Sequence, residues 1–169
     1  EEKFGPDNDA MASVFCHPDL KRYRPQHIEA QLGYYAFDQT VGLGKDSWAA
    51  IKSAMDVALT GADLIINGES SAFSLCRPPG HHASSALMGG YCFINNAAVS
   101  AQHFRDNGYN KVAILDVDYH HGNGTQSIFY DRDDVYFTSI HGDPEQEFPY
   151  FLGYADETGE EAGTGYNLN

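Results

Sequence analysis

The sequence has few basic residues. Ten lysines and arginines stand against 24 aspartates and glutamates, which gives a formal net charge of −14. A nucleic-acid binder needs a basic face to replace the counterions of phosphate groups, so this composition argues against one. The acidity is compatible with cationic partners, such as polyamines or lysine-rich tails, that are attracted over long distances. The simpler alternative is that it only keeps the protein in solution.

Cysteine and long apolar runs are also scarce. Cys16, Cys76 and Cys92 are odd in number and lack CxxC spacing, so no disulfide framework is indicated. A reducing compartment, and therefore a cytoplasmic location, is expected. No apolar run approaches the roughly 18 residues that span a bilayer, and no secretion signal is visible, so no membrane association is expected.

The 169 residues suit one domain or a piece of one. Residues 1–25 are polar and lack periodicity, which predicts an N-terminal arm or loop, and residues 26–169 are predicted to form a partial domain. Helical periodicity and capping residues predict helices over residues 27–32, 46–61, 95–104 and 125–130. In the second of these, Trp48, Ile51, Met55, Ala58 and Leu59 form one apolar stripe, and Gly61 suits the C-terminal end.

Strands are predicted at residues 73–76, 112–118 and 135–140, alternating with helices. The run Val112–Asp118 is nearly continuously apolar, which is typical of a strand in a parallel sheet covered on both faces. We therefore predict a partial three-layer α/β/α sandwich with a mainly parallel sheet, cut at its C-terminus on the approach to another strand.

Histidines follow each predicted strand, as His81-His82, His120-His121 and His141. In open α/β sheets, ligands bind beyond the carboxyl ends of the strands, so these side chains are predicted to gather at one edge.

Asp116, Asp118 and His120 alternate along the chain, so extended backbone would turn their side chains the same way. Two carboxylates brought together at the end of an apolar strand repel each other, and a bound cation relieves that repulsion. Carboxylate and imidazole suit zinc or another divalent transition metal. The alternative is that the aspartates cap the following helix and the histidines only complete hydrogen bonds.

The segment Arg77–Ala83 carries two adjacent histidines in a loop stiffened by prolines. A histidine of near-neutral pKa can take a proton from a metal-activated water and deliver it to a leaving amine. The alternative is a turn with two surface imidazoles.

Four ordered segments resemble signatures of the histone deacetylase and acetylpolyamine amidohydrolase family, in a class II-like form: RPPGHHA, GGYCFINNAA, ILDVDYHHGNGT and SIHGDPEQEFPYFLGYADETG. The resemblance spans roughly residues 25 to 169 and implies an arginase/deacetylase-like fold. It implies a zinc-dependent amidohydrolase that removes acetyl groups from acetyl-lysine or acetylated polyamines. A small polycation is slightly favoured by the acidic composition.

The resemblance further implies that Asp118 and His120 are two of three zinc ligands. It implies that His82 is the general base, with His81 as its electrostatic neighbour oriented by Asp116. The family's third zinc ligand and its catalytic tyrosine belong to motifs that this sequence does not contain. The chain is therefore expected to be catalytically incomplete, and to associate with itself through an exposed sheet edge.

A potassium ion is implied as well. Its inner site would take oxygen atoms from Asp116, Asp118, His120, Ser139 and Ile140. A second monovalent site would use backbone oxygens near Phe129, Arg132 and Val135. Oxygen ligands suit such a hard cation.

Substrate-binding residues are also implied by the resemblance. Tyr91 and Phe151 match the aromatic pair of a narrow tunnel, for which ordinary core packing is the alternative. Gly90 would shape the acetyl pocket. Asp38 resembles a rim aspartate that holds substrate, although it could be a solvated loop carboxylate. Asn123 would orient His82 and, as a neutral partner, would stabilise its imidazolium less than an aspartate does.

Two other readings stay open at this point. An arginase-like ureohydrolase would need a further carboxylate after His121 to bridge two metals, but that position is Gly122. A non-catalytic remnant or module that only recognises acylated ligands is the other.

Overall fold

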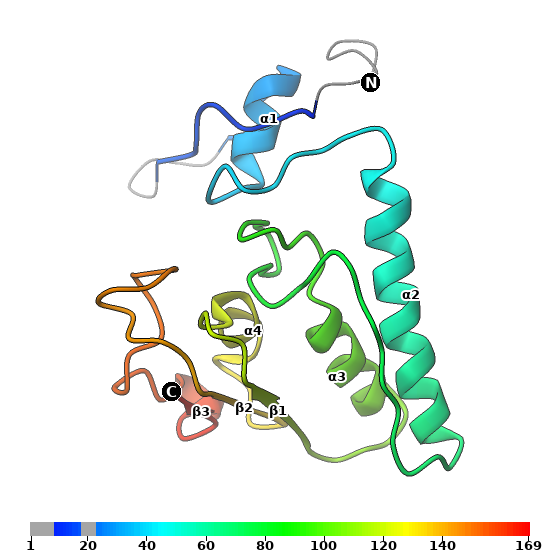
Figure 1. Cartoon of the computed structure of the whole chain (residues 1–169). Coiled ribbons are helices and arrows are strands. Elements are labelled where there is room, and N and C mark those ends of the chain that lie inside the picture. The colour runs from blue at the N-terminus through cyan, green and yellow to red at the C-terminus, as the bar shows by residue number, and fades with distance from the viewer. Residues whose placement is uncertain (1–8, 18–22) are drawn as a thin grey trace.

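A parallel sheet of three strands organises the fold (Figure 1). The structure is a computed structural model that describes residues 9–17 and 23–169. β1 (Val112–Asp116) pairs with β2 (Val135–Ser139), and β2 pairs with β3 (Asn167–Leu168), in the order β1-β2-β3. The register places Asp116 opposite Ser139. The predicted α/β class and parallel sheet are confirmed, and β3 is the strand that the last predicted segment approaches.

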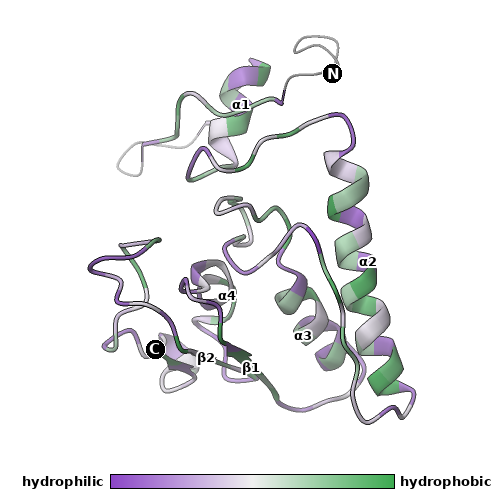
Figure 2. Cartoon of the chain, viewed as in Figure 1, coloured by the Kyte–Doolittle hydropathy of each residue, from purple (hydrophilic) through white to green (hydrophobic). Residues whose placement is uncertain are grey.

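Helices pack on one face of this sheet. α3 (Asn96–Asp106) and α4 (Asn123–Phe129) enclose a core with alternate residues of β1 and β2, and α2 (Ser47–Ile66) packs on the outside of α3. The buried members of this core are Ala98, Ala101, Phe129 and Val135. β1, hydrophobic in Figure 2, turns Val112 and Ile114 towards this core, whereas Leu115 is 62% exposed.

α2 runs five residues past its predicted end at Gly61. Gly61 is instead a contact point, because a Cβ there would lie 2.1 Å from Ser74 Oγ. Ile51 and Ala58 are buried as predicted, but Trp48 is 67% exposed. Within residues 9–17 and 23–169, no helix combines the length and apolar character needed to cross a membrane.

The strand predicted at residues 73–76 is wrong. This segment is extended, but no strand of the described chain pairs with it, and Phe73 and Leu75 are 90% and 80% exposed. It lies along α2, where Ser74 Oγ donates to the Val57 carbonyl and Cys76 Sγ to the Ala54 carbonyl. A strand needs a neighbour for its backbone groups, so apolar residues alone do not produce one. The segment still leads directly to His81 and His82.

The other predicted elements are confirmed with small shifts. α1 (Ile28–Tyr34) is the helix predicted after Pro25. Asn95 caps α3, since its Oδ1 accepts a hydrogen bond from the Ala98 amide. A short 3-10 helix (Glu161–Gly163) precedes β3.

The N-terminal segment folds back on the residues after α1. Ala10 exchanges two backbone hydrogen bonds with Leu43, and Ala12, Ala36 and Val41 form a second buried cluster. The predicted boundary of the arm at residue 25 stays a prediction, and residues 1–8 and 18–22 of that arm lie outside the described residues. A bridge between Ala36 and Met88 then joins this region to the loop after His82.

Candidate active site

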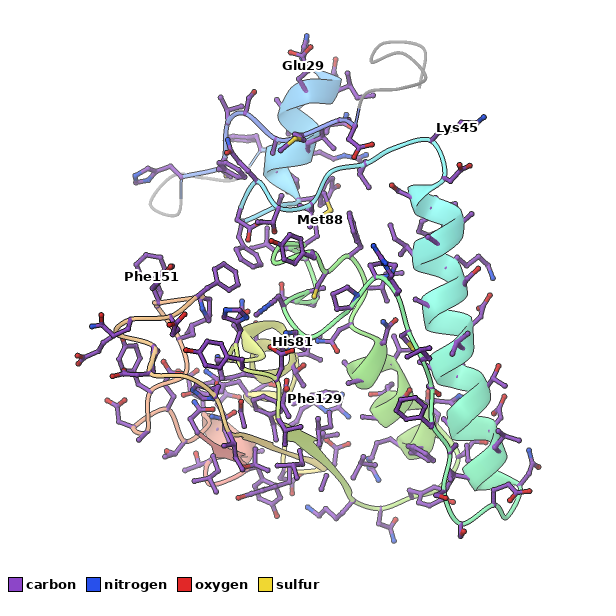
Figure 3. All side chains as sticks on the ribbon, in the orientation of Figure 1. Glu29, Lys45, His81, Met88, Phe129 and Phe151 are labelled. Carbon is purple, nitrogen blue, oxygen red and sulfur yellow. The ribbon has the colours of Figure 1, made fainter. Side chains whose placement is uncertain are left out.

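A cavity of about 300 Å³ opens beyond the carboxyl end of β1. Its walls come from the loops that follow residue 76, β1 and β2, as the sequence predicts, and also from the segment between α1 and α2. The lining residues are Thr40, Pro79, His81, His82, Gly90, Tyr91, Asp118, His120 and Phe148. His81 lies in the interior of the molecule in Figure 3, below the turn that carries Met88.

His81 is held by Asp116, at the last position of β1. Its Nδ1 lies 2.9 Å from Asp116 Oδ2, and its Nε2 lies 3.9 Å from Asp118 Oδ1. Burial acts to raise the pKa of Asp116, but the hydrogen bond and charge of His81 outweigh burial and lower it. A carboxylate fixed at Asp116 therefore orients this imidazole.

His82 is buried and bonded to Asn123 at the start of α4. Its Nδ1 lies 2.7 Å from Asn123 Oδ1. An amide oxygen only accepts hydrogen bonds, so Nδ1 carries the proton and Nε2 of the neutral ring is free to accept one. Burial, followed by the nearby His81, lowers the pKa of His82 to about 4. The ring is thus neutral near pH 7, as a base must be.

Asp118 and His120 meet on the other side of the cavity. Asp118 Oδ1 lies 3.8 Å from His120 Nδ1 and accepts a hydrogen bond from the His120 amide. Two ligands of a tetrahedral zinc ion, each about 2.1 Å from it, lie about 3.4 Å apart. The pair therefore fits two corners of such a site. No group of three or more metal-binding His, Cys, Asp or Glu side chains occurs within residues 9–17 and 23–169.

Two glycines allow close approach around these histidines. A Cβ at Gly122 would lie 2.4 Å from Asp116 Oδ2, so no side chain fits there while Asp116 holds His81. A Cβ at Gly90 would lie 2.2 Å from the His82 ring. Gly90 therefore packs its backbone directly on the candidate base.

Tyr91 and Phe148 are the aromatic walls of the cavity. The Phe148 ring lies edge-on to His82, with centroids 4.9 Å apart, and also approaches His120. Phe151 is the residue expected for this wall, but it does not line the cavity. Its side chain is 86% exposed and projects from the outer loop in Figure 3. Phe148 and Phe151 stand in one Phe-Pro-Tyr-Phe run, residues 148–151. This run predicts an aromatic wall but does not show which of its rings turns towards the cavity.

Asp38 and Ser139 do not line the cavity but bond to other parts of the protein. Asp38 accepts hydrogen bonds from the Gly90 amide and from Thr40. Ser139 is buried opposite Asp116, and its Oγ lies 2.8 Å from His141 Nδ1. His141 Nε2 in turn meets the Gly153 carbonyl.

His121 is a buried structural residue and does not line the cavity. It is 1% exposed, and its Nε2 contacts Gln126 Oε1 and Asn169 Oδ1. Burial, followed by the nearby His141, lowers the pKa of His121 to about 4. The neutral ring links α4 to the end of β3.

Residues 12–169 match the model of the histone deacetylase domain. The chain belongs to the histone deacetylase family. It is 58% identical over 165 residues to acetylpolyamine amidohydrolase 2 of Pseudomonas aeruginosa, covering 98% of this chain and 48% of the relative. It is 37% identical to human histone deacetylase 9, over 76% of this chain and 14% of that protein.

A solved structure shows the same fold. The crystal structure of acetylpolyamine aminohydrolase from Burkholderia pseudomallei matches with a TM-score of 0.87 and 41% identity, over 95% of this chain and 46% of that one. The family resemblance and the fold expected from the sequence are thereby confirmed. Nearly the whole chain matches the curated acetylpolyamine amidohydrolases, but it spans only about half of their length.

Proposed function

We propose that the full-length protein is a zinc-dependent amidohydrolase that removes acetyl groups from acetylated amines, with acetylpolyamines as its first substrate class. The observation that carries this proposal is the cavity where His81, His82, Asp118 and His120 meet. Membership of the histone deacetylase family supports the reaction class. The relatives named acetylpolyamine amidohydrolase, 56–59% identical to this chain, support the substrate class.

His82 is the general base of this proposal. Its unprotonated Nε2 accepts a proton from the attacking water and delivers it to the leaving amine. His81, bonded to Asp116, supports the charge that develops beside His82. The His81 and His82 ring centroids are 4.0 Å apart, close enough for this electrostatic coupling.

Asp118 and His120 are the proposed zinc ligands from this chain. Bound zinc supplies Lewis-acid activation of the water and of the acetyl carbonyl. Catalytic zinc sites use three protein ligands, so we expect the 169-residue chain alone to bind zinc weakly and to hydrolyse poorly. Competition with a chromophoric chelator measures that affinity. Robust zinc-dependent hydrolysis by the isolated chain would contradict this expectation.

Asp116 and Ser139 are proposed to contribute to an inner potassium site together with Asp118, His120 and Ile140. In a neutral His141 ring, Nε2 donates a hydrogen bond to the Gly153 carbonyl, so Nδ1 is an acceptor. The Ser139 hydroxyl then donates its hydrogen bond to Nδ1. The lone pairs of Ser139 Oγ are then available to a hard cation. The second site, near Phe129, Arg132 and Val135, remains a proposal from the family resemblance.

Tyr91 and Phe148 are proposed to hold the methylene stem of the substrate. Two aromatic walls around a cavity of about 300 Å³ suit a slender aliphatic amide and exclude water from it. The acidic composition favours the approach of a polycation.

The test is hydrolysis of N-acetylputrescine and of an acetyl-lysine peptide by the full-length protein. We expect turnover of both and a preference for acetylputrescine. His82→Ala should reduce kcat by about 10²- to 10⁴-fold, and Asp118→Ala should abolish zinc-dependent turnover. Asp156→Ala, an exposed carboxylate elsewhere, is the matched control. Ligand binding without any hydrolysis would favour a binding module instead.

The ureohydrolase alternative is disfavoured by Gly122. A second bridging metal would need a carboxylate at that position, and Asp116 and His81 leave no space for its Cβ. Release of urea from guanidino substrates would support that alternative.

A further inference from the structure

The turn at Gly90 and Tyr91 has an unusual backbone. Both residues have positive φ angles, +54° at Gly90 and +65° at Tyr91. Glycine adopts this region freely, but a bulky aromatic residue does so only where its surroundings hold it. Tyr91 is also 66% exposed, so packing of its own ring does little to hold the backbone.

Asp38 and Thr40 supply that support through one chain of hydrogen bonds. The Gly90 amide donates to Asp38 Oδ2 at 2.9 Å, and the Tyr91 amide donates to Thr40 Oγ1 at 3.0 Å. The Thr40 hydroxyl and amide then both donate to Asp38 Oδ1, at 2.7 and 2.9 Å. Both consecutive amides of the turn are thereby satisfied by side chains 51 or 52 positions earlier in the sequence.

The backbone brings these two segments together. The Phe37 amide donates to the Met88 carbonyl, and the Met88 amide donates to the Tyr35 carbonyl. The ring of Phe37 fills the space beside Gly89, where a Cβ would lie 2.2 Å from it. Asp38 follows directly and is therefore aimed at the turn.

The Gly90–Tyr91 turn contacts both the candidate base and the substrate wall of the cavity. Gly90 packs on the His82 ring, and Tyr91 forms the wall across from Phe148. A shift of this backbone would therefore move the base and the substrate wall together.

We propose that Asp38 and Thr40 are positioning residues that hold the Gly90–Tyr91 turn against His82, and that Asp38 acts in this way rather than by binding the substrate amine. The proposal rests on the proposed amidohydrolase function for its kinetic consequence, and on the hydrogen bonds alone for its structural one. Both oxygens of Asp38 accept hydrogen bonds from the protein, so the carboxylate joins the loop of Thr40 to the turn at Gly90.

Amide hydrogen exchange in the 169-residue chain tests the structural part without any need for activity. Thr40→Val should speed exchange of the Tyr91 amide by about five- to tenfold, the effect of one lost hydrogen bond. Thr40→Ser, which retains the hydroxyl, should restore it. Thr60→Val, on the exposed face of α2, is the matched control. Unchanged exchange in Thr40→Val would overturn the proposal even if the full-length protein is an active enzyme.

Kinetics of full-length Asp38→Asn separate positioning from substrate binding. The substrates are N-acetylputrescine, which is cationic, and N-butylacetamide, a neutral amide of similar length. A positioning role predicts the same rise in KM for both, about five- to tenfold, because both use the Tyr91 wall. A rise confined to the cationic substrate would show that Asp38 binds the amine and would refute the positioning role. If neither substrate is hydrolysed by the unmodified protein, the proposed function fails, and the exchange experiment still decides this proposal.

Discussion

At the scale of single residues, the partner of each imidazole decides what that imidazole can do. His81 faces a carboxylate, Asp116, whereas His82 faces an amide, Asn123. The carboxylate of Asp116 fixes the orientation of the His81 ring, and the amide oxygen of Asn123 fixes the proton of His82 on Nδ1. Burial, followed by the nearby His81, keeps His82 as a neutral base, and the amide of Asn123 opposes this only in part.

Asn123→Asp is expected to raise the pKa of His82 by about one unit, because a carboxylate stabilises the imidazolium. NMR titration of the His82 ring in the metal-free 169-residue chain measures this change. In the full-length protein, the acid limb of kcat/KM should move to higher pH, since more of the base is protonated at a given pH.

Asn107→Asp, at the C-terminal end of α3, serves as the control for an added carboxylate elsewhere. An unchanged or lower pKa of His82 in Asn123→Asp would mean that Asn123 does not orient this ring.

At the scale of elements, an ion-pair cluster joins α3 to the start of β2. Asp134 accepts hydrogen bonds from Arg132 Nε and Nη2 and from Arg105 Nε, at 2.6 to 2.8 Å. The Arg132 hydrogen bond, opposed by partial burial and supported by Arg105, lowers the pKa of Asp134 well below its usual range. The cluster holds the turn that leads into β2, and through β2 it supports the loop after Ser139.

Asp134→Asn should lower the free energy of unfolding at neutral pH by about 1 kcal/mol, the scale of a partly exposed ion-pair cluster. Because the folded-state pKa of Asp134 is depressed, its contribution is complete above the ordinary carboxyl pKa. This contribution to stability is lost as the pH falls from about 5 to about 2. In that range Asp134 becomes protonated in the unfolded chain at a higher pH than in the folded chain. Urea denaturation at several pH values measures both effects.

The neighbouring Asp133→Asn is the control, because Asp133 pairs with Lys111 at the exposed surface. The difference in stability between the Asp134 variant and the unmodified chain should shrink in acid. A difference that stayed constant down to about pH 2 would contradict the role given to Asp134.

At the scale of the whole molecule, β1 is an edge of the three-stranded sheet, unpaired on one side within the described part of the chain. Leu115 is exposed on β1, as are Val117 and Ile140 just after β1 and β2, and Phe73 and Leu75 are exposed on the segment that runs along α2. An edge and an apolar patch of this kind favour association with another chain.

We therefore expect the 169-residue chain to self-associate as its concentration rises, as seen by sedimentation velocity. Leu115→Lys should weaken that association by about tenfold, because a charge on the open face of β1 must be desolvated on contact. Trp48→Lys, on the exposed side of α2, should leave it unchanged. A single monomeric species at every concentration would rule out this prediction.

The sequence by itself determined the class of fold and the edge of the sheet at which its polar residues gather. Apolar runs at residues 112–116 and 135–139 specify parallel strands, and the polar residues after them reach the same edge because parallel strands end together. The contacts of His81 with Asp116 and of His82 with Asn123 follow from that meeting of loops.

Only the tertiary structure decided which side chains face the cavity and which elements find partners. Phe148 rather than Phe151 lines the cavity because the direction of each ring depends on the path of one loop, and no periodic pattern encodes that path. Asp38 turns to the Gly90 amide because a backbone bridge distant in sequence brings the two together. Residues 73–76 are not a strand because a ladder needs a second strand, and a local pattern cannot supply a neighbour.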